Sequence, residues 1–207
     1  MSEQKHSVFT IGHSTHSLEA LVALLKQHGV TALADVRSAP FSRFNPQFNK
    51  DALERSLKAQ GIKYVFLGRE LGARSDDRSC YENGRVQYSR LARTALFHSG
   101  IERVMRGAQD HNIALMCAEK EPLDCHRTLL VARALDELGV AVAHILSDGQ
   151  LEVHGDTMDR LLDVLKLPRE NPFGSKQELI AEALAHREEQ VAYVDEKLAA
   201  EAAGDAQ

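Results

Sequence analysis

Residues 113–127 read IALMCAEKEPLDCHR, and this stretch decides the fold class. Its first part, Ile113–Cys117, is apolar at every position, which is typical of a strand buried on both faces of a parallel sheet. Pro122 stiffens the polar loop that follows, and a helical pattern with one apolar face runs from His126 to Leu138. A buried strand, a short loop and a helix in this order are typical of strand–helix–strand units.

Short apolar runs alternate with helical patterns on both sides of this stretch. Further buried strands are expected at residues 7–11, 31–36, 62–67 and 140–146, and residues 68–87 are expected to be irregular. Helices are expected at 18–25, at 49–60, over 88–109 with an interruption at Ser99-Gly100, and from Asp156 or Thr157 to just before Pro168. The sequence therefore predicts an α/β fold with a mainly parallel, five-stranded, Rossmann-like sheet and helices on both faces.

The composition changes near the C-terminal end, which divides the chain into an α/β domain at 1–170 and an extension at 171–207. The extension begins with a linker, Asn171-Pro172-Phe173-Gly174, and continues as a charged helical pattern over 176–203. This stretch carries a thin apolar stripe formed by Ile180, Leu184, Val191, Val194 and Leu198. The stripe can pack back on the domain, pair with a second copy in a homodimer, or belong to a mobile tail, and these alternatives stay open.

The composition is that of an ordinary globular protein, with 43% hydrophobic and 27% charged residues. No apolar run has the roughly 18 residues of a membrane span, and the N-terminal residues lack the apolar stretch of a secretory signal. We therefore expect a cytoplasmic protein without a membrane partner. Cys80, Cys117 and Cys125 are an odd number of cysteines, so free thiols are expected rather than a disulfide framework.

The charge is unevenly distributed along the chain. Residues 175–207 hold eight acidic and three basic residues, which accounts for the whole net charge of −5. Residues 37–93, by contrast, hold twelve basic and six acidic residues. This local excess of positive charge can attract an anionic small molecule or a nucleic acid, although a mixed solvated surface would have the same composition.

Reactive side chains gather in the segments that follow the predicted strands. In a parallel sheet, ligands bind outside the carboxyl ends of the strands, where helix N-termini also point. The sequence therefore predicts a pocket at this edge of the sheet. The segments expected there are Gly12–Ser14, Asp35–Arg43, Gly68–Arg74, Cys117–Arg127 and Ser147–His154.

The segment from Cys117 to Arg127 is the most informative of these. Cys125 stands at a helix N-terminus beside His126 and Arg127, which favours its thiolate and makes it a candidate nucleophile. Cys117 can act in the same way if it faces the cleft, but a buried core cysteine is the alternative. Arg127 continues the buried face of the helix, so we expect it to point toward Glu119, another acid or an anionic ligand. A purely structural ion pair between Arg127 and Glu119 is the competing interpretation.

The spacing argues against two known kinds of site. A loop that cradles phosphate between a cysteine and an arginine closes in one tight turn, whereas nine residues separate Cys117 from Arg127 and one separates Cys125 from it. Zinc-ligand types occur near the strand ends, but the adjacent Cys125-His126 is the one closely spaced pair, and adjacent residues rarely share an ion. No metal and no other cofactor is therefore predicted.

Two further strand ends add candidate residues. His13, in the turn after the first strand, is a candidate acid or base. Ser14 can help to hold an anion or can simply cap the next helix. Asp35 and Arg37 lie on one side of a strand end, where they can pair with each other or with groups from residues 117–127.

The loop Phe41-Ser42-Arg43-Phe44-Asn45 interleaves aromatic, basic and amide side chains. This combination suits stacking on a base and binding of a phosphate, with Arg43 as the cation. A surface loop anchored by its two phenylalanines would have the same sequence. Arg69 and Arg74 add two more bases after the third strand.

Five segments stand out together: TIGHST (10–15), DVRSAPFSRFNPQFN (35–49), YVFLGRELGAR (64–74), LMCAEKEPLDCHR (115–127) and HI-SDG (144–149). Over roughly residues 8–155, they resemble a bacterial and archaeal family catalogued as domain of unknown function 488. The resemblance implies an α/β fold but no activity, and labels suggesting DNA repair on some members imply a nucleic-acid link.

Three functions are compatible with these residues. The first is an enzyme, a hydrolase or a transferase, that acts on a phosphorylated nucleotide or nucleic-acid substrate. The second is a non-catalytic module that binds the same ligands, and the third is a thiol-based redox or sulfur-transfer protein. The candidate catalytic residues are Glu119, Cys125, His13 and Cys117, and the candidate substrate- or anion-binding residues are Ser14, Asp35, Arg37, Arg43, Arg69, His126 and Arg127.

Overall fold

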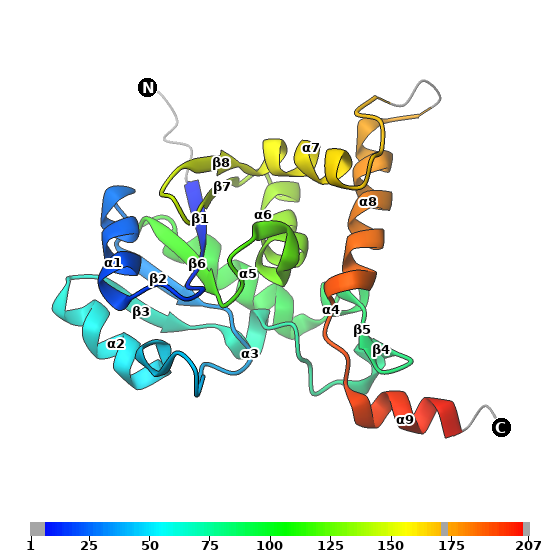
Figure 1. Cartoon of the computed structure of the whole chain (residues 1–207), viewed down its shortest axis with the longest axis horizontal. Helices are drawn as coiled ribbons and strands as arrows, with labels where there is room; N and C mark the ends of the chain where they lie inside the picture. The colour runs from blue at the N-terminus through cyan, green and yellow to red at the C-terminus, as the bar shows by residue number, and fades with distance from the viewer. Residues whose placement is uncertain (1–6, 171–173, 205–207) are drawn as a thin grey trace.

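The central sheet has six strands, one more than predicted. The computed structural model describes residues 7–170 and 174–204, so the predicted linker residues 171–173 lie outside the described part. All five predicted strands are confirmed, and they run parallel to one another. The strands are β1 Ser7–Gly12, β2 Ala32–Asp35, β3 Lys63–Phe66, β6 Ile113–Cys117, β7 Ala141–Ile145 and β8 Leu151–Val153, in the order β3-β2-β6-β1-β7-β8 (Figure 1).

The sixth strand, β8, pairs antiparallel with β7 at one edge of the sheet. The predicted turn at Ser147-Asp148-Gly149 reverses the chain, and Leu146 N donates a hydrogen bond to Gln150 O (2.9 Å). Leu151 and Val153, the apolar residues of β8, are both exposed. Because β8 is short and its apolar side chains face solvent, hydrophobic periodicity does not indicate it.

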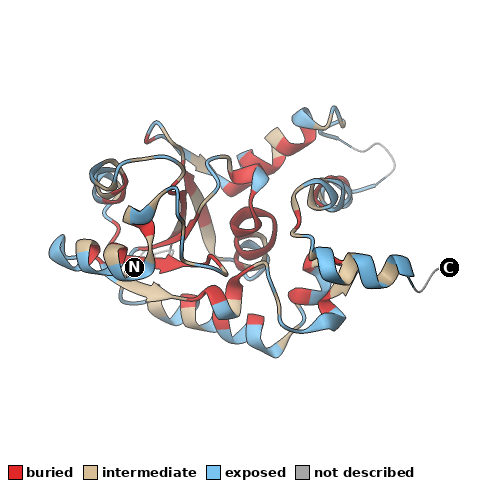
Figure 2. Ribbon diagram, turned by 60° about the horizontal axis from the view of Figure 1, so that its bottom comes forward, coloured by how far each residue is buried: buried red, intermediate tan, exposed pale blue. Residues whose placement is uncertain are grey.

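Helices cover both faces of the sheet, as predicted. α1 and α2 pack on one face, and α5, α6 and α7 pack on the other (Figures 1 and 2). None of the helices in the described part of the chain is long and apolar enough to cross a membrane. The five helices that cover the sheet are α1 Leu18–Gln27, α2 Lys50–Ala59, α5 Ala95–Gly107, α6 Arg133–Glu137 and α7 His154–Val164.

Side chains of each strand alternate between two buried cores. In β6, Ala114 and Met116 face α1 and α2, whereas Ile113, Leu115 and Cys117 face the opposite side. The helix that follows begins with a π-helical turn directly after the loop and continues as α6 on that same side. The alternation therefore turns the Cys117 side chain toward the helix that starts after Cys125.

The helix predicted over 88–109 is two helices, and the break lies before α5 rather than inside it. α4 is Tyr88–Leu91, and Thr94 then caps α5 through its side-chain hydroxyl. Gly100, which suggested an interruption, lies within α5 at a point where a Cβ atom would overlap Leu71. This glycine marks close packing of α5 rather than a helix break.

Residues 68–87, expected to be irregular, contain several short elements. Elements of two to four residues are too short to show a periodic pattern. They are α3 Gly68–Leu71, a 3₁₀ turn at Arg78–Cys80, and a hairpin of β4 Tyr81–Glu82 and β5 Arg85–Val86.

The C-terminal extension forms two helices, α8 Lys176–Val191 and α9 Glu196–Gly204, rather than one continuous stretch. Leu179, Ala183 and Leu184 of α8 are buried against the domain, next to α7 (Figure 1). Of the three alternatives for the apolar stripe, the structure therefore shows docking for α8. Pairing in a homodimer stays a prediction.

Candidate functional site

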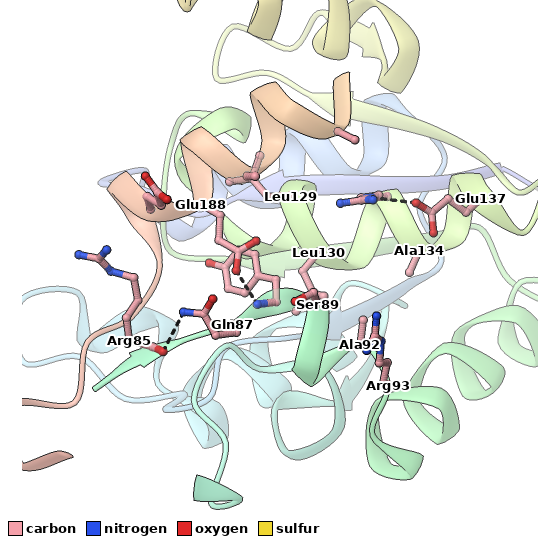
Figure 3. A pocket seen from close by; sticks show the side chains of 15 residues that line it. Arg85, Gln87, Ser89, Ala92, Arg93, Leu129, Leu130, Ala134, Glu137 and Glu188 are labelled. Atoms are coloured by element: carbon pink, nitrogen blue, oxygen red, sulfur yellow. Dashed lines mark hydrogen bonds and ion pairs between the residues drawn. The ribbon is translucent and has the colours of Figure 1, made fainter. Parts of the chain in front are cut away.

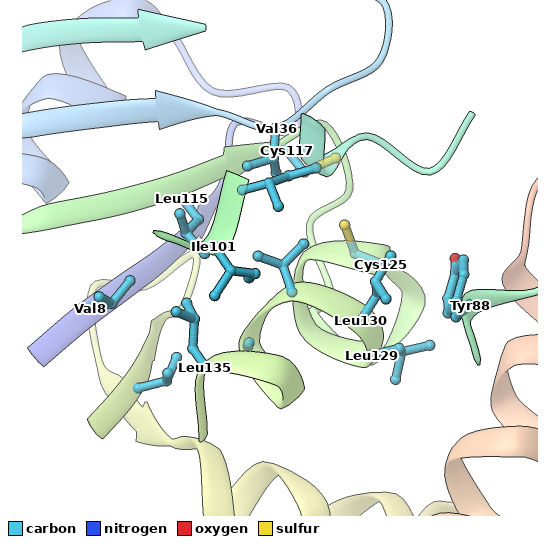
Figure 4. Close-up of a cluster of buried hydrophobic side chains, with 14 of the residues drawn as sticks. Val8, Val36, Tyr88, Ile101, Leu115, Cys117, Cys125, Leu129, Leu130 and Leu135 are labelled. Atoms are coloured by element: carbon cyan, nitrogen blue, oxygen red, sulfur yellow. The ribbon is translucent and has the colours of Figure 1, made fainter. Parts of the chain in front are cut away.

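Cys117 and Cys125 lie at one end of the apolar core between the sheet and α6 (Figure 4). Cys117 is the last residue of β6, and Cys125 is extended immediately before the π-helical turn Arg127–Ala132. Both side chains are buried, and they are free thiols, as is Cys80. Cys117 is thus a buried cysteine, and it has reactive neighbours.

The imidazole of His126 lies against both sulfur atoms. His126 Nδ1 is 3.7 Å from Cys117 Sγ and 3.9 Å from Cys125 Sγ. The other ring nitrogen, Nε2, is 3.0 Å from the carbonyl oxygen of Val36, which can only accept a hydrogen bond. Nε2 therefore carries a proton, and in the neutral ring Nδ1 presents its lone pair to the sulfurs. On the other side, Cys125 Sγ lies 3.0 Å from Glu119 Oε2.

The pKa values of these four groups depend on one another. Burial raises the pKa of the Cys117 thiol, and the neighbouring Cys125 raises it further. Burial alone would also raise the pKa of Cys125, but the Cys117 hydrogen bond and the charge of Arg127 lower it well below its ordinary value. Burial and Cys125 raise the pKa of Glu119, and Cys125 raises that of His126 against the effect of burial. Of the two thiols, these surroundings therefore favour the thiolate form at Cys125 over that at Cys117.

Arg127 supports the loop from beneath. Its side chain is fully buried, with Nη1 donating to Glu119 O (2.7 Å) and Nη2 donating to Lys120 O (3.2 Å). Its backbone N–H donates to Cys125 Sγ (3.4 Å). The predicted direction toward Glu119 holds, but the contact is with the carbonyl group, so the expected carboxylate pair does not form. The buried helix face places the guanidinium under the loop, away from the cavities described next.

Two adjoining cavities open above this cluster. The first, which we call the thiol pocket, has a volume of about 270 Å³, and the second, the loop pocket, has about 430 Å³. They share Arg37, Ala39 and Ala118 as walls. Cys117, Glu119, His126, Arg74 and Tyr193 also line the thiol pocket, and His13, Ser14, Thr15, Phe41 and Asn45 also line the loop pocket.

Arg37 stands between the two pockets and is held by Asp35. Its Nε and Nη2 donate to Asp35 Oδ1 (2.9 Å) and Oδ2 (2.6 Å), and Nη2 also donates to Phe48 O (2.8 Å). Tyr64 donates its hydroxyl to Asp35 Oδ2 (2.8 Å). Asp35 is fully buried and lines neither pocket, so it orients Arg37 instead of meeting a ligand itself. The strand-end pairing of these two residues is the first of the predicted alternatives.

His13 is a neutral, buried ring that faces Arg37. Its Nδ1 donates to Ser14 O (2.9 Å), which leaves Nε2 to accept from Arg37 Nη1 (3.3 Å). Burial lowers the pKa of His13 to about 4, and the charge of Arg37 acts in the same direction. The ring also stacks on Phe48, with 4.4 Å between the ring centroids.

Ser14 and Thr15 do not cap the following helix. Ser17 does so, because its Oγ accepts a hydrogen bond from Ala20 N (3.1 Å). The Ser14 and Thr15 side chains line the loop pocket instead. The backbone N–H of Ser14 donates to Ala118 O (2.9 Å), so this amide is committed to the sheet edge and not to an anion.

The loop at residues 41–45 is not anchored by its phenylalanines. Phe41 is 67% exposed and Phe44 is 89% exposed. Polar contacts hold the loop: Ser42 N donates to Asn49 Oδ1 (2.7 Å), and Ser42 Oγ accepts from Phe44 N (3.2 Å). Arg43, between the two rings, is exposed as well. Of the two interpretations of this loop, the anchored one is therefore wrong.

Arg69 and Tyr193 are the residues whose positions differ most from expectation. Arg69 is exposed on α3 and lines neither pocket. Tyr193, between α8 and α9, reaches the thiol pocket and carries the Arg74 guanidinium over its ring, 4.4 Å from the centroid. No sequence signal marked Tyr193, because only the docking of α8 brings it to the strand ends.

A third cavity, of about 470 Å³, lies between α4, α6 and α8 (Figure 3). Leu129, Leu130 and Ala134 form its apolar wall, and Glu188 of α8 accepts a hydrogen bond from Tyr88 N (2.5 Å) beside it. None of the candidate residues lines it, and we regard it as the seam along which α8 docks.

The geometry thus brings most of the predicted site residues to one edge of the sheet, around two pockets. No curated protein and no solved structure shows a significant match to the chain. A family model described as domain of unknown function DUF488 matches residues 17–134, which include both the loop at residues 41–45 and the cysteine–histidine cluster. This match covers more than half of the sequence, and the chain is therefore a member of the DUF488 family.

Proposed function

We propose that the protein is an enzyme, a hydrolase or a transferase, that acts on a phosphorylated nucleotide or nucleic-acid substrate. One observation carries this proposal: Phe41 lines the loop pocket and is exposed, and two further exposed side chains, Arg43 and Phe44, follow it in the same loop. Exposed aromatic rings next to a base are the side chains with which proteins stack nucleobases and hold the adjoining phosphate.

The polar walls of the pockets suit the rest of such a substrate. Ser14, Thr15 and Asn45 offer hydroxyl and amide groups in the loop pocket, and Arg37 stands at its boundary with the thiol pocket. The Asp35 carboxylate fixes the Arg37 guanidinium in place, so this donor loses little freedom when it meets an anion. The excess of basic residues over 37–93 adds long-range attraction.

The chemistry is assigned to the neighbouring thiol pocket. Glu119 lines this pocket and contacts Cys125, so its carboxyl group can take up or deliver a proton at the reacting end of a substrate bound across both pockets. His126 and Cys117 line the same pocket, and Cys125 lies directly behind them. A stacking rim next to a pocket that holds groups for proton transfer favours an enzyme over a binding module.

Calorimetric titration with nucleoside monophosphates and short single-stranded oligonucleotides tests the binding step. Replacing Phe41 or Phe44 by alanine should weaken binding roughly 5- to 150-fold, because each stacked base contributes about 1–3 kcal/mol. Leu138→Ala removes another exposed apolar side chain, one that lines neither pocket, and should leave the affinity unchanged. Equal affinity of wild type and both phenylalanine variants would contradict the proposal.

Product analysis tests the catalytic step. The protein is incubated with the nucleotides that bind, and the products are separated by chromatography and identified by mass spectrometry. Glu119→Gln should retain binding and abolish product formation, because the amide cannot transfer the proton. Binding that falls steeply with salt and yields no product with any bound nucleotide would favour the non-catalytic module instead.

A further inference from the structure

We infer that Cys117, Cys125 and His126 bind one zinc ion. The three ligand atoms, Cys117 Sγ, Cys125 Sγ and His126 Nδ1, all lie within 4.8 Å of one another, and all three residues are buried. The inference concerns the base of the thiol pocket and goes beyond the proposed reaction. It rests on side-chain geometry alone and does not depend on the identity of the substrate.

The distances match the edges of a tetrahedral zinc site. Zn–S bonds of about 2.3 Å and Zn–N bonds of about 2.0–2.1 Å, at tetrahedral angles, place sulfur and nitrogen roughly 3.6 Å apart. The observed separations from His126 Nδ1 are 3.7 Å to Cys117 Sγ and 3.9 Å to Cys125 Sγ. Little movement is needed for an ion to sit between the three atoms.

The surroundings orient the ligands in the way that metal ligands are oriented. The proton on His126 Nε2 is donated to Val36 O (3.0 Å), so the lone pair on Nδ1 is directed at the sulfurs. The backbone N–H of Arg127 donates to Cys125 Sγ (3.4 Å), a contact that favours the thiolate form that metals bind. β2, β6 and the π-helical turn each fix one part of this arrangement, so the site is formed by the fold.

The donor atoms select the class of metal. Two thiolates and an imidazole suit zinc, whereas magnesium and calcium require oxygen ligands. Both cysteines must lose a proton to bind zinc, and the divalent ion neutralises the two buried thiolates that result. Cys80, the third cysteine, is also buried but does not belong to this group of potential ligands.

The open side of this set faces the thiol pocket. Cys117 and His126 line the pocket, and Glu119 lines it beside them. Three protein ligands with a fourth position open to a cavity are the arrangement of catalytic zinc sites, in contrast to the closed four-ligand structural sites. A water molecule in the fourth position would lie next to the Glu119 carboxyl group.

The adjacency of Cys125 and His126, which argued against a shared ion, is overcome by the backbone. Cys125 has extended dihedral angles, φ −138° and ψ 136°, whereas His126 is already helical at φ −58° and ψ −26°. The chain therefore changes direction between the two residues. This change turns both side chains toward the end of β6, where Cys117 completes the set.

Cobalt titration of the metal-free, full-length protein tests the inference, because cobalt(II) reports its ligands by absorption. We expect saturation at one cobalt per chain, visible bands of tetrahedral coordination, and a thiolate-to-cobalt charge-transfer band. Zinc should displace the cobalt and raise the thermal midpoint of unfolding. Cys117→Ser, Cys125→Ser and His126→Gln should each weaken uptake at least tenfold. Cys80→Ser, an equally buried cysteine changed in the same way, should bind as the wild type does.

The wild-type measurements decide the question even if a cluster variant does not fold. Absence of the charge-transfer band, or a thermal midpoint that zinc leaves unchanged, would overturn the inference. The inference would also be overturned if Cys117 and Cys125 form a disulfide and the protein still takes up no metal once this disulfide has been reduced. Phe41→Ala should retain the full cobalt spectrum while losing nucleotide affinity, and Cys125→Ser should do the reverse. Failure of the zinc site and failure of the proposed function are thereby distinguished.

Discussion

Arg127 is a fully buried cation whose Nη1 and Nη2 donate to the loop above it, whereas its Nε has no hydrogen-bond partner among the described residues. Two carbonyl groups, of Glu119 and Lys120, accept from its guanidinium, and its charge helps to lower the pKa of the Cys125 thiol. A buried guanidinium needs such partners because water cannot solvate it. By holding the two carbonyls inward, Arg127 leaves the Glu119 side chain free to line the thiol pocket.

Gly12 is the residue that makes room for this arrangement. A Cβ atom at this position would overlap the carbonyl oxygen of Glu119 and would lie 3.3 Å from Arg127 Nη2. We predict that Gly12→Ala lowers the free energy of unfolding by roughly 1–3 kcal/mol, because the backbone carbonyl cannot move aside without disturbing the loop. Chemical denaturation followed by circular dichroism measures the change.

The matched control is Gly155→Ala in α7, where a Cβ atom would meet nothing within 4 Å. This substitution should leave stability unchanged or raise it by up to about 1 kcal/mol, because alanine favours helix more than glycine does. Equal stability of the Gly12 and Gly155 variants would show that the loop does not pack on β1 as described.

At the scale of elements, the docking of α8 extends the domain toward the site. α8 buries Leu179, Ala183 and Leu184, and its end leads the chain to Tyr193, which forms part of the thiol pocket. Arg187 of α8 also forms an ion pair with Asp124 in the loop before Cys125. One element outside the parallel sheet therefore closes a side of the candidate site.

We predict that Leu184→Ala lowers the free energy of unfolding by about 2–4 kcal/mol, the usual cost of removing a buried leucine side chain. Leu198→Ala in α9, which is only partly buried, should cost well under half of that. Urea denaturation compares the two. If the variants are equally stable, α8 is not docked in solution, and homodimer pairing becomes the better account of its stripe.

At the scale of the whole molecule, neutral buried histidines tie stability to pH. Thr10 Oγ1 of β1 lies 2.7 Å from His144 Nδ1 of β7, and His144 Nε2 lies 3.0 Å from Nδ1 of His154, the first residue of α7. Burial lowers the pKa of both of these histidines, for His144 well below its ordinary value. His13 is held neutral in the same way, with a pKa of about 4.

The expected consequence is a loss of stability on acidification. Above the ordinary histidine pKa of about 6.5, folded and unfolded chains bind the same protons at these positions. Below this pH the histidines of the unfolded chain bind protons, whereas the buried histidines of the folded chain do not. Each of them therefore lowers the free energy of unfolding by up to about 1.4 kcal/mol for every pH unit, until the pH reaches its pKa in the folded protein. Urea denaturation at several pH values from about 7.5 to about 5, a range that includes the ordinary histidine pKa of about 6.5, measures the slope.

Variants separate this effect from general acid denaturation. His144→Gln removes one of the buried rings and should reduce the slope, whereas His98→Gln removes an exposed ring and should not. An identical slope in wild type and His144→Gln would contradict the assignment of the pH dependence to the buried histidines.

The helix and strand order was predictable because it depends on local pattern. Ile113–Cys117 was identified residue for residue, since a continuous apolar run in a short segment is a local property. β8 was not predicted, because exposed apolar residues at a sheet edge give no periodic signal. The docking of α8 was one of three open alternatives, because a thin helical stripe has several possible partners. Phe41 and Phe44 show that apolar character alone does not decide burial, because both side chains are exposed although an anchoring role was one interpretation of the loop.

The sequence by itself determined the α/β class, the order of the parallel strands along the chain, and the loops in which the candidate residues lie. These follow from short-range periodicity, since neighbouring residues alone decide whether a segment can be a buried strand or a one-sided helix. Only the tertiary structure decided which candidates meet. It placed Cys117 against His126 and Cys125, buried Arg127 and Asp35 as supports, left Arg69 outside, and added Tyr193. The physical reason is that each of these contacts joins segments whose approach depends on how the sheet and helices pack, which no local pattern encodes.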